Sequence, residues 1–155
     1  GCDIVEVSES EVNMTPATKL KLVEMAVKEG FKVQAELGPH FADAPFPVGH
    51  TIKQCRDYLN AGAFKVCLEG DVIRFMKPWE DGAMADKMHT IIDEVGIDNL
   101  VIEGGDDLKA AQWFVLHYGP EVSFGNVPFE MIIKLEHVRR GLNIAPTWFG
   151  KFASL

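Results

Sequence analysis

Residues 63–69 read AFKVCLE, a short apolar run that ends on a glutamate. Four more runs share this character, and the five together lie at residues 3–7, 31–36, 63–69, 99–103 and 122–126. The first four finish on or next to a glutamate, with intervals of 30, 33 and 34 residues between Glu6, Glu36, Glu69 and Glu103. Such an interval fits one strand, one helix and two loops. The pattern therefore predicts consecutive strands of a parallel sheet whose carboxylates meet at one edge.

The segments between these runs have helical periodicity and lie at residues 16–28, 51–60, 82–94, 108–117 and 129–140. Thr15 can cap the first of these helices, with Pro16 at the first helical position. Strand and helix thus alternate five times, and the strands are too apolar to leave either face in water. Two connections, residues 38–50 and 70–81, are long and follow the carboxyl end of a strand, where functional loops usually lie.

Five strand–helix units leave two architectures open. An open, doubly wound sheet needs no further units, whereas an eight-stranded barrel needs three more. A parallel half-barrel would expose its inward side chains and two unpaired edges. The chain starts at Gly1, directly in a strand and without Met, which favours a barrel whose first three units are missing. We therefore expect that residues 1–155 alone do not form a stable monomer.

The composition is that of an ordinary globular domain, with 47% hydrophobic and 25% charged residues. A formal net charge of −8 and the lack of a basic stripe argue against a nucleic-acid surface. Arg139 and Arg140 form the only adjacent basic pair, which we interpret as a solvent-exposed helix face. No run approaches the ~18 apolar residues of a membrane span, and no signal peptide opens the chain. Three cysteines without CxxC spacing predict a cytoplasmic protein without disulfides or a zinc knuckle.

Glu36, Glu69 and Glu103 are the candidate metal ligands or substrate-binding groups. Carboxylates grouped at one edge of a sheet repel one another unless a cation or a shared proton relieves them. Magnesium prefers oxygen ligands and takes few of them from protein. The alternative is that each glutamate pairs with a lysine or arginine at the rim. Asp106 and Asp107 also have two interpretations, as ligands or as caps of the following helix.

Five segments resemble the second, larger part of the phosphosulfolactate synthase family, and they read GCDIVEVS (1–8), GFKVQAELG (30–38), AGAFKVCLEG (61–70), NLVIEGGD with WFVLHYGPEVSFGNV (99–106 and 113–127) and LEHVRRGL (135–142). The family has an α/β fold, the TIM (β/α)8 barrel. The resemblance therefore implies that residues 1–155 are the C-terminal part of a single barrel domain and supply its strands four to eight.

The same resemblance implies an activity. It points to a magnesium-dependent lyase of the coenzyme M pathway, which joins sulfite to the methylene carbon of phosphoenolpyruvate. A divalent cation held by Glu36, Glu69 and Glu103 would stabilise the negative charge that builds on the enol carboxylate. Glu69 is assigned a catalytic role as well as a metal-binding one.

Several site motifs depart from the family. Where the family has GKK, whose lysine resembles a general acid, this chain has Gly38-Pro39-His40, so His40 is the candidate proton donor. Where the family has a phosphate-type RESG sequence, residues 70–74 read GDVIR, and only Arg74 could bind the anion. The family's NLxNI becomes SFGNV, in which Asn126 is the second candidate substrate-binding residue. These departures predict a changed, small anionic substrate.

Three hypotheses follow from the match and the departures. The first is a divergent magnesium-dependent lyase that adds sulfite to phosphoenolpyruvate or a related enol or keto acid. The second is the same enzyme with another small nucleophile in place of sulfite. The third is a non-catalytic barrel relative that serves as a binding or stress-protective scaffold. Neither nucleic acid nor a membrane is an expected partner, whereas a homo-oligomer or a complementing N-terminal segment could complete the fold.

Overall fold

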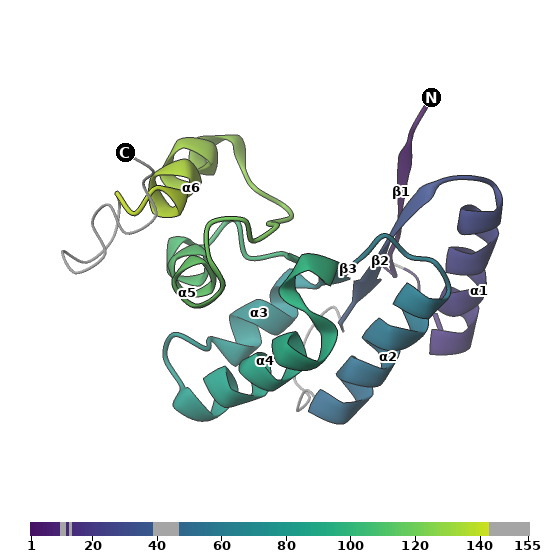
Figure 1. Ribbon diagram of the computed structural model, residues 1–155, viewed down its shortest axis with the longest axis horizontal. Helices are drawn as coiled ribbons and strands as arrows, with labels where there is room; N and C mark the ends of the chain where they lie inside the picture. Colours follow the sequence, from purple (N-terminus) through teal and green to yellow (C-terminus); the bar gives the residue numbers. More distant parts are fainter. Residues whose placement is uncertain (10–11, 13, 39–46, 143–155) are drawn as a thin grey trace.

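A computed structural model describes residues 1–9, 12, 14–38 and 47–142 (Figure 1). Its sheet contains four parallel strands, β1 (Ile4–Val7), β2 (Lys32–Leu37), β3 (Lys65–Leu68) and β4 (Leu100–Ile102), in the spatial order β1-β2-β3-β4. The prediction of a parallel α/β fold is confirmed. A doubly wound sheet reverses its strand order at one point, and the four described strands show no reversal.

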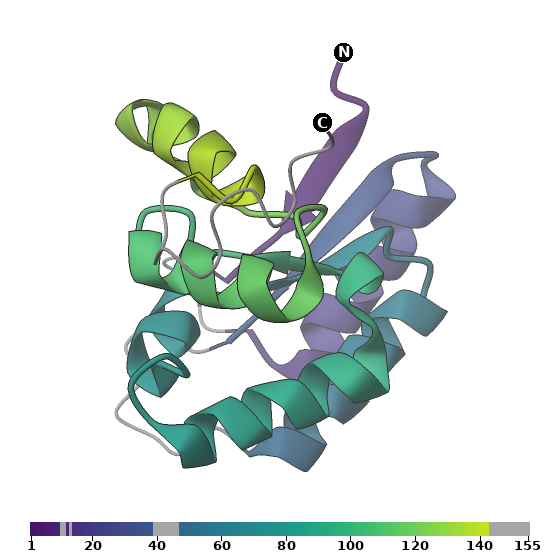
Figure 2. The ribbon, with the colours of Figure 1, turned by 60° about the vertical axis from the view of Figure 1, so that its left-hand side comes forward.

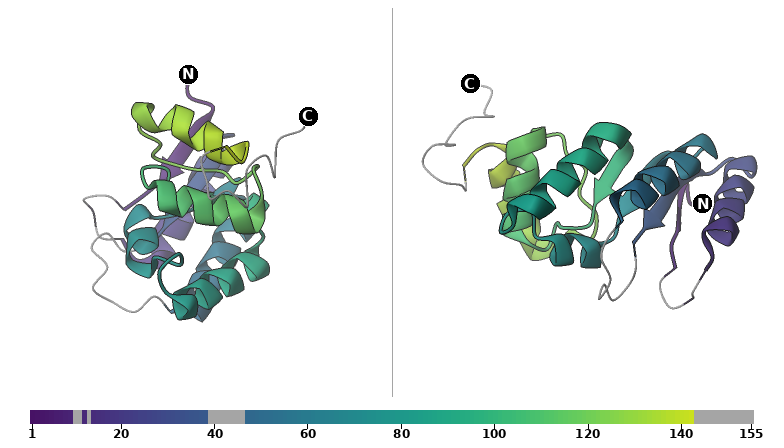
Figure 3. Two further views of the ribbon diagram at one scale, coloured as in Figure 1. Left: turned by 90° about the vertical axis from the view of Figure 1, so that its left-hand side faces the viewer. Right: turned by 90° about the horizontal axis from the view of Figure 1, so that it is seen from below.

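In the part of the chain that the structure describes, six α-helices connect or follow the strands: α1 (Pro16–Lys28), α2 (Val48–Asn60), α3 (Gly70–Met76), α4 (Gly82–Val95), α5 (Leu108–Tyr118) and α6 (Ile132–Arg139). Two short 3-10 helices precede β4 and α6, namely η1 (Ile97–Asn99) and η2 (Phe129–Met131). Helices α1, α2 and α4 lie side by side in chain order (Figures 1 and 3). Figure 1 shows α5 and α6 at the opposite end of the molecule from α1, and Figure 2 shows α5 and α6 next to each other.

One face of the sheet carries the apolar core. Alternate strand residues, such as Ala35, Val66 and Ile102, are fully buried and belong to one hydrophobic cluster with Val23 of α1 and Met88 of α4. Right-handed crossovers between strands in sequential order place their helices on the same face of a sheet. The sequential strand order and the shared core thus have a common cause.

The other face of the sheet is polar. The register pairs Glu6 with Gln34 and Glu36 with Cys67, so these side chains share the face opposite the core residues. Gln34 donates a hydrogen bond to the Glu6 carboxylate across the strands. A sheet that packs its apolar residues against helices on one face directs its carboxylates to the other face.

Helix α1 follows the sequence prediction residue by residue. Thr15 accepts a hydrogen bond from the Thr18 amide at 3.2 Å, and Pro16 occupies the first helical position. This cap satisfies one of the amides that a helix start leaves without a partner inside the helix.

The prediction of a loop at residues 70–81 is wrong in its first half, because α3 forms there. Its start is capped by the Glu69 side chain, which accepts from the Asp71 amide at 3.2 Å. Ile73 and Met76 are 1% exposed, so the short helix is fixed by core packing. The helix ends at Lys77, whose φ of 38° lies in the left-handed region.

The prediction of a fifth strand at residues 122–126 is also wrong. Only Phe124 forms an isolated parallel bridge, to Ile102 of β4. Asn126 has a φ of 49°, a left-handed conformation that no extended strand continues. The segment therefore runs beside β4 without becoming part of the regular sheet.

Arg139 corrects the prediction of a fully solvent-exposed basic pair. Its guanidinium donates hydrogen bonds to the carbonyls of Pro120 and Val122 and lies 5.5 Å from the ring centre of Phe124. Arg140, by contrast, is exposed and pairs with Glu136 at 2.6 Å. Arg139 thus ties α6 to the segment beside β4. Within the described ranges, no helix combines the length and apolarity needed to cross a bilayer.

Candidate functional site

Three buried glutamates converge at the carboxyl ends of neighbouring strands. Glu36 lies in β2, Glu69 follows β3 and Glu103 follows β4. Their side chains each offer an oxygen within 4.8 Å of the other two, although the residues are only 4%, 6% and 5% exposed. The spacing of the sequence runs predicted this convergence, and the geometry agrees. Their service as metal ligands stays a prediction.

The electrostatics of this cluster favour an added proton or cation. Burial raises the pKa of Glu103 to about 7, and a hydrogen bond to Glu69 together with the charges of Glu69 and Glu36 adds to the rise. A hydrogen bond with the Cys67 thiol acts in the opposite direction. The raised pKa means that ionised Glu103 is unfavourable in this cluster. A bound divalent cation would neutralise that negative charge.

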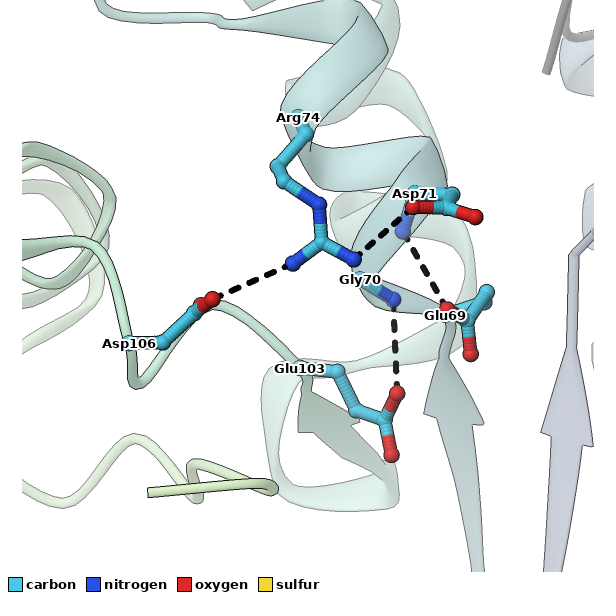
Figure 4. Close-up of polar contacts among 6 residues, drawn as sticks. All are labelled: Glu69, Gly70, Asp71, Arg74, Glu103 and Asp106. Carbon is cyan, nitrogen blue, oxygen red and sulfur yellow. Dashed lines mark hydrogen bonds and ion pairs between the residues drawn. The ribbon is translucent and has the colours of Figure 1, made fainter. Parts of the chain in front are cut away.

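Backbone amides at the start of α3 hold two of the three carboxylates in place (Figure 4). The Gly70 amide donates to Glu103 at 3.3 Å, and the Asp71 amide donates to Glu69 at 3.2 Å. A Cβ at position 70 would lie 2.8 Å from the Glu103 carbonyl oxygen, so only glycine fits there without a shift. The turn from β3 into α3, which sequence reasoning treated as a loop, is therefore what brings Glu69 and Glu103 together.

Glu36 is held from the opposite side of the cluster. The Ser8 hydroxyl donates to its carboxylate at 3.0 Å, and the ammonium of Lys19 donates to its backbone carbonyl at 3.0 Å. Sequence reasoning missed Lys19. The signal was its position four residues before the buried Val23, because residues four apart share one face of a helix.

Arg74 lies beside the cluster and is engaged by two aspartates (Figure 4). Its guanidinium is 2.8 Å from Asp71 and 3.3 Å from Asp106, and the hydrogen bond to Asp71 raises the pKa of Arg74. The arginine thereby links α3 to the loop after β4. Its predicted contact with substrate stays a prediction.

The remaining candidates differ in how close they lie to the three glutamates. Asn126 is exposed, and its neighbour Gly125 packs on Glu103, since a Cβ there would lie 3.1 Å from Glu103 Cγ. Asp107 accepts from the Lys109 amide at 2.8 Å, which identifies it as the cap of α5. His40, the predicted proton donor, lies outside the described residues.

A second group of possible ligands shares Glu103 with the first. Glu6, Cys67 and Glu103 also offer atoms within 4.8 Å of one another. Glu6 is exposed, whereas Cys67 is fully buried, and burial raises the pKa of its thiol. A buried thiol that resists ionisation is a poor ligand for a hard cation. The three-glutamate cluster is therefore the better candidate.

Comparison with known proteins identifies relatives over almost the whole chain. Residues 1–144 match the model of the family described as (2R)-phospho-3-sulfolactate synthase (ComA). The phosphosulfolactate synthase of Methanothermobacter thermautotrophicus is 31% identical over 148 residues, which cover 92% of this chain and 57% of the relative. The phosphosulfolactate synthase of Methanocaldococcus jannaschii is 26% identical over 149 residues, covering 92% and 58%. The chain thus spans less than three fifths of the length of these relatives.

Proposed function

This chain belongs to the (2R)-phospho-3-sulfolactate synthase (ComA) family, and from that premise we propose that it carries the carboxylate cluster of a magnesium-dependent lyase. The lyase would add sulfite, or another small nucleophile, to phosphoenolpyruvate or a related enol or keto acid. The observation that carries the proposal is the convergence of Glu36, Glu69 and Glu103 at one edge of the sheet.

The donor set suits magnesium. All three side chains offer carboxylate oxygens, the ligands that this hard cation prefers, and they come from three separate strand ends. Magnesium bound by them would supply the positive charge that stabilises an enolate formed when a nucleophile adds to an enol carboxylate. The same three carboxylates would exclude an anionic substrate if no cation were present, because like charges repel.

The chain's own residues would bind and orient the substrate. Arg74 stands beside the cluster, and its ion pairs with Asp71 and Asp106 hold its guanidinium at a defined position. A substrate phosphate or carboxylate would have to share the guanidinium with these aspartates or displace one of them. Asn126 is the second candidate, beside Gly125 on the β4 side. His40 is proposed as the proton donor in place of the family's lysine, because it follows the second strand-like run in a long connection of the sequence.

We also propose that the sheet is an arc of a (β/α)8 barrel. The sequential strand order and the helices on one face are what such an arc requires. Within the described residues β1 pairs only with β2, and its free edge adjoins an apolar surface that includes Leu22, Met25 and Phe31. The part of the relatives' length that this chain does not span is proposed to cover that edge.

A second candidate function rests on Arg74. Its two ion pairs engage the only arginine proposed for the substrate anion, which favours a non-catalytic barrel that binds ligands or protects other proteins. In that case the cluster would bind a cation for stability alone. Turnover separates the two candidates.

The test is a turnover assay with the purified protein, phosphoenolpyruvate and sulfite, followed by phosphorus NMR with magnesium and with chelator. The lyase proposal predicts a new phosphorus signal that requires magnesium and disappears in Glu69→Gln. Glu130→Gln is the matched control, since Glu130 is exposed on η2 and lies outside the cluster. Product formed equally by Glu69→Gln would refute the role of the cluster, and no product under any condition would favour the scaffold.

A further inference from the structure

Lys19 is an almost completely buried lysine next to the carboxylate cluster. The residue is 1% exposed, and its ammonium lies 2.9 Å from a Glu9 carboxylate oxygen. The same ammonium donates to the Glu36 backbone carbonyl at 3.0 Å. Lysine is rarely buried unless its charge is paired, because removing an ammonium from water is costly. The contact of this buried ammonium with the Glu36 backbone therefore suggests that Lys19 helps to position Glu36.

Two residues that donate hydrogen bonds to Glu36 come from the segment after β1 and from α1. Ser8 donates from its hydroxyl to Glu36 Oε1 at 3.0 Å, and Glu9, the next residue, holds Lys19. Ser8 thus holds the Glu36 carboxylate, and Lys19 holds the Glu36 backbone. Glu69 and Glu103 each accept a hydrogen bond from a backbone amide at the start of α3.

Glu36 has a physical need for such fixation. Three carboxylates within 4.8 Å repel one another, and Glu36, which lies on β2 at one side of the three strands, could relieve the repulsion by turning away. A hydroxyl hydrogen bond restricts that rotation, and a lysine on the carbonyl fixes the strand end beneath it. Groups that orient metal ligands in this way commonly control the affinity for the metal.

We propose that Ser8 and Lys19 are positioning residues that hold the Glu36 carboxylate where it joins Glu69 and Glu103 in binding a divalent cation. This inference rests on the proposed function, because it takes the three glutamates to be cation ligands. Neither positioning residue needs to touch the cation. Both act through Glu36, so their effect on cation affinity should vanish when the Glu36 carboxylate is absent.

The test is a Mn²⁺ titration of the whole chain, read by electron paramagnetic resonance of the free ion. Ser8→Ala should weaken Mn²⁺ binding by about tenfold, the lower end of the effect expected for a group that orients a ligand. In a Glu36→Gln background the same substitution should change the affinity by no more than about twofold, because Ser8 acts through the Glu36 carboxylate, which is then absent. If Ser8 acted independently of Glu36, the loss of affinity would be the same in both backgrounds. An unchanged affinity in Ser8→Ala, or an equal loss in both backgrounds, would overturn the inference.

A second variant tests Lys19 without leaving its partner charged. Lys19→Met combined with Glu9→Gln removes the buried ammonium and the charge of its partly buried partner, and it should weaken Mn²⁺ binding by about tenfold only when Glu36 is intact. Should this variant fail to fold, Ser8→Ala still decides the proposal. Ser123→Ala is the matched control, since Ser123 accepts from Lys65 at 2.8 Å rather than contacting Glu36. It should bind Mn²⁺ as the wild type does.

The outcomes separate this inference from the function on which it rests. A wild-type protein that binds no Mn²⁺ would contradict the proposed function and the inference together. A wild-type protein that binds Mn²⁺ normally, with Ser8→Ala unaffected, would contradict the inference alone.

Discussion

The raised pKa of Glu103 predicts that metal-free protein loses stability as the pH rises, and that Glu103→Gln removes this loss. Burial and the neighbouring carboxylates raise the Glu103 pKa from 4.5 to about 7 in the folded state. Below pH 4.5 the carboxyl is neutral in both states. Between pH 4.5 and about 7 the Glu103 carboxyl is ionised in the unfolded chain but still protonated in the folded protein. The free energy of unfolding therefore falls over this range, and the contribution of the protonated carboxyl is lost above a pH of about 7.

The magnitude follows from the size of the rise in pKa. One pKa unit corresponds to about 1.36 kcal/mol, so a change from 4.5 to about 7 corresponds to about 3 kcal/mol between pH 4 and pH 8. Glu103 is 5% exposed, so solvent screens this effect little. The neutral amide in Glu103→Gln cannot ionise, and the variant should therefore lack this component of the pH dependence.

The assay is urea unfolding of wild type, Glu103→Gln and the control Glu130→Gln, in chelator, across that pH range. The difference in free energy of unfolding between wild type and Glu103→Gln should change by about 3 kcal/mol in favour of the variant as the pH rises. Glu130→Gln should follow the wild type. Parallel curves of the free energy of unfolding against pH for wild type and Glu103→Gln would refute the claim that burial and the neighbouring carboxylates raise the pKa of Glu103.

Three further predictions concern the cation, the turn into α3 and the first helix. Magnesium at a hundred times its dissociation constant should raise the free energy of unfolding by about 2.7 kcal/mol in wild type but not in Glu69→Gln, as thermal unfolding would measure. Gly70→Ala should cost about 1–3 kcal/mol in urea unfolding, because its Cβ meets a backbone oxygen at 2.8 Å, whereas Gly82→Ala, with nothing within 4 Å, should not destabilise. Thr15→Ala should cost about 1 kcal/mol by losing the Thr18 bond, and an unchanged urea midpoint would contradict that cap.

The sequence predicted the features that depend on local periodicity. Apolar runs at regular intervals predicted the parallel strands, and Thr15 with Pro16 predicted the start of α1. The convergence of Glu36, Glu69 and Glu103 followed from the same intervals, because residues at equivalent strand ends meet at one edge of a parallel sheet.

The features that the sequence did not predict depend on contacts distant in the chain. Helix α3 starts with a glycine and is only seven residues long, so its periodicity is too short to recognise without the burial of Ile73 and Met76. Residues 122–126 have a strand-like composition, yet the left-handed Asn126 ends their pairing with β4 after one bridge. The burial of Lys19 depends on Glu9 and Glu36, which only the fold brings to it.

The family comparison and the geometry support the account from different directions. The match over residues 1–144 identifies the family, while the cluster of carboxylates comes from the fold alone. Because the chain spans 57% of the length of one relative, its activity has to be measured and is not assigned from that relative. The three carboxylates of the cluster, by contrast, all lie within the described residues.

The most direct test of the central claim is a crystal of the protein soaked with Mn²⁺, with anomalous diffraction measured at the manganese edge. The account predicts one strong anomalous peak bounded by the carboxylates of Glu36, Glu69 and Glu103, and its loss in crystals of Glu69→Gln. A well-ordered cluster without a peak, or a peak only at other surface carboxylates, would contradict the claim that these three residues form a divalent cation site.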